Sequence, residues 1–251
     1  MKNKNKIDEQ PENDIQYKKC CIVLLGDYNT SYNKLQAISP ETAKKKLAIK
    51  RGDISSTIAR LRMAYSLNKL VFKPEYSPEV AETYLQLLKM NLYWFAYESF
   101  SKKLTKIGIN NYLRLSNQYP EIDIHITDAK KELNSLKNDF DNIKDYITFL
   151  SSVASPSLKT QLDTLNLKMV NEFNLAEQMT FIYAIRNNFV HNGDAAGTEL
   201  SYNIKNKLFP ILIKLLENIL FKVGIKIMES EIIKVNNLLK KEETKQLKIA
   251  K

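Results

Sequence analysis

Apolar residues recur every three or four positions along most of the chain, a spacing typical of helices with one buried face. The clearest example spans residues 77–104. It begins at Ser77 and Pro78, a serine cap followed by proline at the first helical position. This spacing predicts a long amphipathic helix. Its expected buried face consists of Tyr84, Leu87, Leu88, Leu92, Phe95 and Ser99.

The rest of the chain gives weaker patterns of the same kind. Residues 119–127 are an exception, because isoleucines alternate there with polar residues and favour a short extended segment. The apolar run from Cys20 to Leu25 fits either a buried strand or the start of a helix. Further helices are expected over residues 40–50, 53–70 with Asp53 as the N-cap, 128–150, 156–171, 200–223 ending at Gly224, and 225–239.

These patterns predict an all-α helical bundle. The polar residues 1–16 are expected to be disordered, and the turn formers from Asp27 to Asn33 to form a loop. The expected organisation is a disordered tail (1–16), a basic N-terminal helical extension (17–76), a helical bundle (77–223) with an insertion at 105–155, and a C-terminal helix with a charged tail (224–251).

The composition narrows the class of protein. The chain has 251 residues but only 6 glycines and 7 prolines, which favours helices. No apolar run reaches the ~18 residues of a membrane span, and the N-terminus lacks the apolar core of a signal peptide. The two cysteines, Cys20 and Cys21, are adjacent, which argues against a disulfide or a zinc site. The sequence therefore predicts a cytoplasmic protein.

The net charge of +10 is unevenly distributed. Residues 1–76 carry +7 and residues 201–251 carry +6, whereas residues 77–200 carry −3. Basic flanks of this kind attract a phosphate-bearing partner such as RNA, although a lysine-rich surface can also serve solubility alone.

The segment Ala184–Gly193 concentrates polar chemistry near the end of an amphipathic pattern. Asn174 and Glu177 have the spacing of a capping box at the start of this helix, and Gly193 is placed as its C-cap. Buried positions are expected at Leu175, Met179, Ile182, Ile185 and Phe189.

Three polar residues stand out in this segment. Asn187 and His191 are four apart and share a helix face, while Arg186 is long enough to reach toward it. Arginine is a fixed fork of donors for phosphate oxygens, histidine exchanges a proton near neutral pH, and asparagine can orient either group.

This set suits cleavage of RNA by its own 2′-hydroxyl, which needs a base, an acid and a cation at the phosphate. One histidine supplies only one of the two proton transfers at a time. Two copies related by a two-fold axis would bring two histidines and two arginines to one cleft. The sequence thus suggests a composite site in a homodimer. The other histidine, His125, is expected at the surface without a catalytic role.

The segment Arg186-Asn187-x-x-x-His191, followed by Asn-Gly, resembles the RNxxxH motif of the HEPN superfamily. The resemblance covers about residues 77–223. It implies a four-helix core with the motif on its third helix, with extra N- and C-terminal helices in this chain. It also implies catalytic roles for Arg186 and His191 and a supporting role for Asn187. Glu98 matches the acidic residue that family members often carry near the motif arginine, and would pair with Arg186.

The resemblance implies a metal-independent endoribonuclease of a prokaryotic toxin–antitoxin, abortive-infection or antiviral defence system. Such an enzyme acts as a homodimer without cofactors and has an antitoxin or effector protein as a partner. Two alternatives remain open. One is a non-catalytic HEPN-like module that binds RNA or protein, and the other is a helical scaffold whose partner is a protein.

Overall fold

The structure, a computed structural model, describes residues 12–68, 77–192 and 200–249. All regular elements in these ranges are helices, and no strand occurs among them. The predicted all-α helical fold is therefore confirmed. The described residues divide into two compact units, one built from residues 51–220 and the other from the residues up to 50 and from 221 onward. This division differs from the boundaries at 77 and 223 expected from the sequence.

In the unit that contains the N-terminal segment, the regular elements among the described residues are helices. The long helix α11 (Tyr202–Ile249) contributes its part after Leu220 to this unit. The other elements are α1 (Glu12–Lys18), the π-helical turn η1 (Lys19–Leu24), α2 (Leu25–Ile38) and α3 (Pro40–Lys45).

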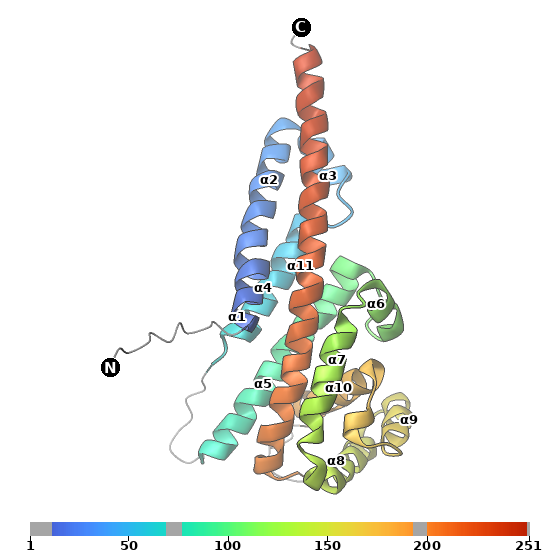
Figure 1. Ribbon diagram of the computed structural model, residues 1–251. Helices are drawn as coiled ribbons and strands as arrows, with labels where there is room; N and C mark the ends of the chain where they lie inside the picture. The colour runs from blue at the N-terminus through green and yellow to red at the C-terminus, as the bar shows by residue number, and fades with distance from the viewer. Residues whose placement is uncertain (1–11, 69–76, 193–199, 250–251) are drawn as a thin grey trace, which may run out of the picture. The chain divides into compact units, whose positions relative to one another are not determined.

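In this unit the segment α1–α2 runs alongside the C-terminal part of α11 (Figure 1). Lys222 Nζ lies 3.2 Å from Glu12 Oε1, and Gln246 Nε2 donates to the Ile38 carbonyl at 3.4 Å. The paired positions are 210 residues apart at the first contact and 208 at the second. The two stretches therefore run in the same direction with a nearly constant register.

Two predictions for the N-terminal segment are wrong. The predicted disorder of residues 1–16 fails over residues 12–16, which are helical because Gln16 is buried and the Tyr17 ring packs edge-on against Phe221 at a centroid distance of 6.2 Å; residues 1–11 lie outside the described residues. The expected loop at Asp27–Asn33 lies within α2. Its turn-forming residues occupy a helix whose buried positions, Tyr28 and Leu35, are seven residues apart, which is two helical turns. The Cys20–Leu25 run is helical, not a strand.

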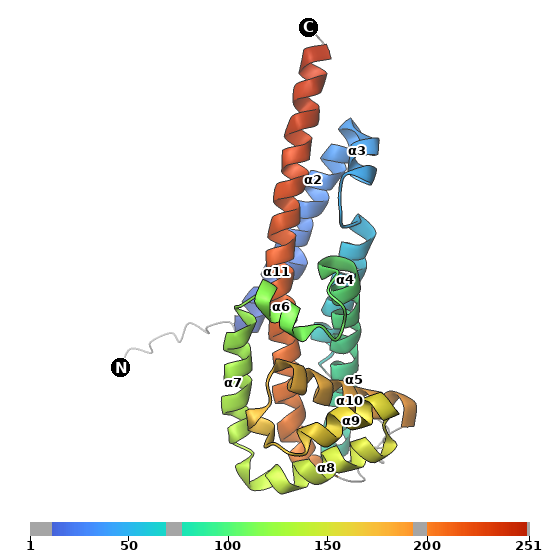
Figure 2. The same ribbon diagram turned by 90° about the vertical axis from the view of Figure 1, so that its right-hand side faces the viewer.

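The second unit contains the elements around the sequence motif (Figure 2). It comprises α4 (Arg51–Ser66), α5 (Pro78–Ser99), η2 (Phe100–Thr105), α6 (Tyr112–Gln118), α7 (Ile122–Asn134), η3 (Lys137–Asp139), α8 (Phe140–Val153), α9 (Pro156–Leu165), η4 (Val170–Glu172), α10 (Leu175–Asn192) and the first part of α11.

Helix α5 starts as the sequence predicts, since Ser77 is the N-cap and its side chain accepts a hydrogen bond from Val80 N. It continues through η2 and stops at Lys106, which has a left-handed φ of 57°. The helix therefore also ends close to the expected Leu104. By contrast, α4 begins at Arg51, two residues before the expected cap Asp53.

The buried face of α5 is only partly the expected one. Leu87 and Ser99 are buried, but Phe95 is 39% exposed and Tyr84 is half-buried. The buried face of α5 differs from the expected one because α5 contacts both α4 and α11. Ser99 Oγ lies 2.8 Å from Thr57 Oγ1 on α4, whereas Tyr93, on another face of α5, donates to Glu217 of α11 at 2.7 Å. Residues buried on α5 besides these are Thr83, Met90, Asn91, Trp94, Ala96 and Tyr97.

The region 119–153 differs most from the prediction. The expected extended segment is helical, because α7 begins at Ile122. The single helix expected over 128–150 is two, α7 and α8, separated by the 3₁₀ turn η3. Helix α7 is tied to α11, where Lys214 Nζ lies 2.5 Å from Glu132 Oε1.

Helix α11 does not end at Gly224. It continues without interruption from Tyr202 to Ile249, so the two helices expected at 200–223 and 225–239 are one, and the charged stretch after Lys240 is helical. Glycine in a helix interior costs about 1 kcal/mol relative to alanine. Apolar residues on both sides of Gly224, including Val223, Ile227 and Met228, are buried and offset this term.

Candidate active site at the end of helix α10

Helix α10 carries the sequence motif, and its start is fixed by the predicted capping box. Asn174 Oδ1 accepts from Glu177 N at 3.0 Å, and Glu177 Oε2 accepts from Asn174 N at 2.8 Å. The other oxygen of Glu177 lies 2.6 Å from Lys168 Nζ. These bonds satisfy backbone donors that the first helical turn leaves without partners.

The body of α10 is embedded in its unit. It packs against α5 on one side and against α8 and α9 on another (Figure 2). Four of the five residues expected on its buried face, Leu175, Met179, Ile182 and Ile185, are buried, whereas Phe189 is half-buried. Because the first four turns are held by packing, the last turns occupy a fixed position at the edge of the core.

Arg186 lies at the point where α10 leaves the core. Its side chain is half-buried, and its guanidinium carbon lies 5.1 Å from the ring centroid of Phe95 on α5. Its Nε is buried and has no hydrogen-bond partner among the described residues. A desolvated donor without a partner is unfavourable unless a ligand supplies an acceptor. The arginine is thus positioned by an aromatic ring and keeps donors available.

The expected ion pair between Glu98 and Arg186 is not present in the described structure. Glu98 is half-buried and accepts a hydrogen bond at 3.0 Å from Trp94 Nε1, one helical turn earlier on α5. This bond satisfies the carboxylate within its own helix. Phe95, which the sequence suggested as a core residue, occupies the place beside Arg186 instead.

His191 lies in the last turn of α10 and is exposed. Asn187, one turn earlier on the same face, is half-buried. Arg186 and His191 are separated by about 7.5 Å along the helix axis and by about 140° around it, from helix geometry. The structure therefore places Asn187 on the face of the exposed imidazole, and Arg186 at the same helix end but on a different face. The predicted cap Gly193 lies outside the described residues.

Asn188 is a buried polar residue that the sequence reasoning missed. It is 4% exposed; its Oδ1 accepts from Asn192 Nδ2 at 2.9 Å, while its own Nδ2 is buried without a partner in the described chain. Its position three residues after Ile185 on the buried face is the signal that could have revealed it. The amide links the last turn of α10 to the core.

Tyr183 of α10 contacts an aromatic side chain of α5, and a further tyrosine pair joins α5 and α6. The Tyr183 ring lies 5.3 Å from that of Trp94, and the Tyr97 and Tyr112 rings stack at 6.5 Å. Burial, with a smaller contribution from Tyr112, raises the pKa of Tyr97, and burial, with a smaller contribution from Tyr183, raises the pKa of Tyr112. These phenols therefore stay neutral and act as hydrogen-bonding groups rather than as bases.

The side chains at this helix end are of types that can bind a phosphate and transfer a proton. Arginine binds phosphate oxygens and an exposed imidazole can give or take a proton. No group of three or more His, Cys, Asp or Glu side chains able to hold a metal ion occurs among the described residues. Of the described helices, none combines the length and apolar content required to cross a bilayer. Comparisons with protein-family models, curated proteins and solved structures find no match for the chain.

Proposed function

We propose that the chain is a metal-independent endoribonuclease of the HEPN type, with Arg186 and His191 as its catalytic residues and Asn187 in a supporting role. One observation carries the proposal. Arg186 and Asn187, both half-buried, and His191, which is exposed, lie in the last two turns of a helix whose body is packed in the core. A buried guanidinium nitrogen without a partner adds a donor that a phosphate can satisfy.

In the proposed reaction the RNA supplies its own nucleophile. One imidazole removes the proton of the 2′-hydroxyl, and the 2′-oxygen attacks the adjacent phosphorus. The bond from phosphorus to the 5′-oxygen breaks, and a second, protonated imidazole gives this oxygen its proton. The guanidinium stabilises the negative charge on the phosphate in the transition state. The products are a 2′,3′-cyclic phosphate, which water opens to a 3′-phosphate, and a free 5′-hydroxyl.

A homodimer would supply the second imidazole. Two apolar side chains lie next to the motif and are exposed, Phe95 at 39% and Val190 at 44%. Val190 is four residues after Arg186 and therefore on its face of the helix. Exposed apolar residues beside a charged motif support burial against a second copy related by a two-fold axis.

The test is a cleavage assay with purified protein, total cellular RNA and EDTA. The proposal predicts cleavage by the intact chain, and a loss of at least about a hundredfold in Arg186→Ala and His191→Ala, from the usual size of general acid–base and electrostatic terms. His125→Ala is the matched control, because it removes the other histidine, which lies on α7. The same variants should relieve growth inhibition if the chain is a toxin or defence protein.

Unchanged cleavage in both motif variants would reject the assignment. So would activity that EDTA abolishes. Cleavage that leaves 3′-hydroxyl ends would also contradict the proposal. Attack by the 2′-oxygen breaks the bond from phosphorus to the 5′-oxygen and therefore leaves the phosphate on the 3′ end.

A non-catalytic RNA-binding module is the second candidate, and one observation favours it. Four lysines and Glu242 line a cleft of about 600 Å³ in the unit formed by α1–α3 and the end of α11: Lys46, Lys240, Lys241 and Lys245. Lys245 lies 2.8 Å from Glu242, whereas the other three lysines form no ion pair among the described residues. Free ammonium groups around a cleft suit a phosphate backbone.

A gel shift with Lys240→Glu and Lys241→Glu combined tests this candidate. RNA binding that falls steeply with salt, that the lysine variant loses and that Lys248→Glu keeps, would support it. If the intact chain also cleaves no RNA, the binding module replaces the ribonuclease. RNA binding that the combined variant leaves unchanged would reject a role for this cleft.

A further inference from the structure

A second cavity lies in the unit of residues 51–220, at the opposite end of α10 from the motif. It has a volume of about 470 Å³, within the ~300–1,000 Å³ range of small-molecule sites. Its walls come from α6, α7 and the first turn of α10. Two of these helices belong to the 105–155 insertion, to which the proposed ribonuclease activity gives no role.

One side of the cavity offers donors for an anion. Leu175 and Ala176 line it, and their backbone N–H groups belong to the first turn of an 18-residue helix, where no carbonyl of the same helix can accept from them. Aligned peptide dipoles add partial positive charge at this end. Lys130 of α7 also lines the cavity; it is half-buried and makes no ion pair within the described residues.

A largely buried tyrosine without a hydrogen-bond partner in the described part of the chain provides an independent indication of a ligand. Tyr112 lines the cavity, is 8% exposed and stacks on Tyr97. Its hydroxyl has no hydrogen-bond partner among the described residues, although Tyr97 donates to the Ile109 carbonyl at 2.9 Å. Because burial raises the pKa of Tyr112, the group keeps its proton and can donate. The side chain is held by its packing on Tyr97, so its hydroxyl is an available donor at the wall of the cavity.

The cavity also contains an acidic side chain, two turns before Lys130 on the same face of α7. Asp123 lines it, and one of its carboxylate oxygens accepts from Ser116 Oγ at 2.7 Å. The remaining lone pairs can accept hydrogen bonds from hydroxyl groups, as a carboxylate does for a ribose. The same carboxylate repels a small bare anion held at Lys130. The cavity is therefore suited to a molecule with an anionic end and a hydroxyl-bearing end. Ile126 and Leu175 add apolar surface between them.

We infer that this cavity is a binding site for a small organic phosphate with free hydroxyl groups, of the nucleoside monophosphate class. The phosphate lies against Lys130 and the first N–H groups of α10, Tyr112 donates to it, and Asp123 accepts from the sugar hydroxyls. The inference does not depend on the proposed ribonuclease activity, because AMP contains no phosphodiester bond to cleave and binding is measured directly.

Calorimetric titration of the full chain with AMP in low salt tests the inference, with inorganic phosphate and adenosine as comparison ligands. AMP should bind at least about tenfold more tightly than either, since each lacks one of the two recognised ends. Lys130→Ala should weaken AMP binding about tenfold or more, because it removes a charge-assisted hydrogen bond. Tyr112→Phe should weaken it severalfold while keeping the stacked ring.

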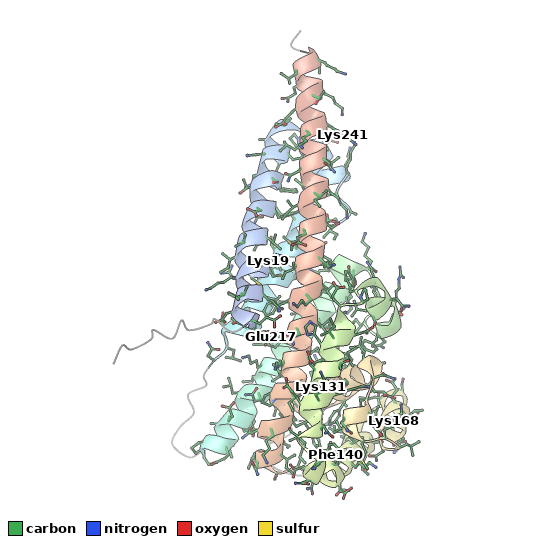
Figure 3. All side chains as sticks on the ribbon, viewed as in Figure 1. Lys19, Lys131, Phe140, Lys168, Glu217 and Lys241 are labelled. Atoms are coloured by element: carbon green, nitrogen blue, oxygen red, sulfur yellow. The ribbon has the colours of Figure 1, made fainter. Side chains whose placement is uncertain are left out.

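Two control variants separate this site from other parts of the surface. Lys131→Ala removes the neighbouring exposed lysine of α7, which is not part of the cavity, and should bind AMP as the intact chain does (Figure 3). Arg186→Ala should also leave AMP affinity unchanged, which excludes binding at the motif. No AMP binding, equal affinity for AMP and inorganic phosphate, or unchanged AMP affinity in Lys130→Ala would overturn the inference.

Discussion

The guanidinium carbon of Arg186 lies 5.1 Å from the centre of the Phe95 ring, and this contact rather than a carboxylate holds the motif arginine. A cation over an aromatic face gains about 0.5–1 kcal/mol at an exposed site. An aromatic partner does not use up the hydrogen-bond donors of the guanidinium, whereas a carboxylate would occupy two of them. The arginine can therefore be oriented and still bind a phosphate.

Replacing Phe95 by alanine should lower kcat/KM for RNA by about twofold to fivefold, the kinetic equivalent of the lost cation–π interaction. Because the ring is 39% exposed, the melting temperature should fall little. Cleavage rates and thermal melts of Phe95→Ala and Phe95→Tyr, which keeps an aromatic face, measure the effect. Equal loss in the two variants would show that the aromatic face does not position the arginine.

Glu98→Gln should change the cleavage rate by less than about twofold, because the amide oxygen can still accept from Trp94 Nε1 and no ion pair is lost. The rate is measured beside Phe95→Ala under the same conditions. A fall larger than that of the phenylalanine variant would restore Glu98 as the functional partner of Arg186.

Asn174→Ala should destabilise the chain by about 1 kcal/mol, the usual cost of losing an N-cap. Asn174 bonds Glu177 in both directions, so the variant removes one of these bonds and loosens the other. Urea unfolding at neutral pH measures the change. Asn117→Ala, at an exposed position of α6, serves as the control and should lie within about 0.5 kcal/mol of the intact chain. Equal stability of the two variants would contradict the capping box.

Alkaline pH should destabilise the chain through Tyr97 and Tyr112. Burial raises the pKa of both phenols above the ~10 of an unfolded chain, so folding favours their neutral form. Their contribution is complete below about pH 10 and is lost as the pH rises further, by up to about 1.4 kcal/mol per pH unit for each group. Unfolding free energies above and below this pH measure the slope. In the double variant with phenylalanine at both positions, the unfolding free energy should fall less steeply above pH ~10. An unchanged slope would show that these two phenols do not cause the loss of stability.

The sequence identified those features that depend on local chemistry. The Ser77 and Asn174 caps are hydrogen bonds within a single turn, and both occur as predicted. The buried face of α10 was also predictable, since its apolar positions follow one helical period. These two helix starts therefore needed no knowledge of the tertiary structure, whereas α4 begins before its expected cap Asp53.

Sequence patterns that fit two different local structures were less informative about secondary structure. Ile122 and Ile126 fit an alternating strand, but they are also four apart and lie on one face of α7, while Ile124 is 63% exposed. Gly224 was interpreted as a helix end. The burial of the apolar residues around it, which stabilises a continuous α11, depends on contacts that form only in the folded chain. In both places tertiary packing decides between local alternatives.

The candidate site shows the same limit. The residues of the motif could be found by their type and spacing, and they lie together because one helix carries them. The partner of Arg186 could not, because choosing between Phe95 and Glu98 requires the rotation of α5, which its contacts with α4 and α11 determine. The period of apolar residues predicts which residues share a helix face, but it does not determine which neighbouring helix packs against that face.

The most direct test of the proposed chemistry is cleavage of an RNA oligonucleotide that carries a single 2′-deoxynucleotide immediately before a mapped cleavage position. The assay uses purified protein in EDTA, with the unmodified oligonucleotide alongside. If the RNA supplies its own nucleophile at the site formed by Arg186 and His191, the modified position stays intact, and the unmodified strand yields a cyclic or 3′-phosphate end that His191→Ala no longer produces. Cleavage at the deoxynucleotide would show that water or a protein group attacks the phosphate, and would contradict the account.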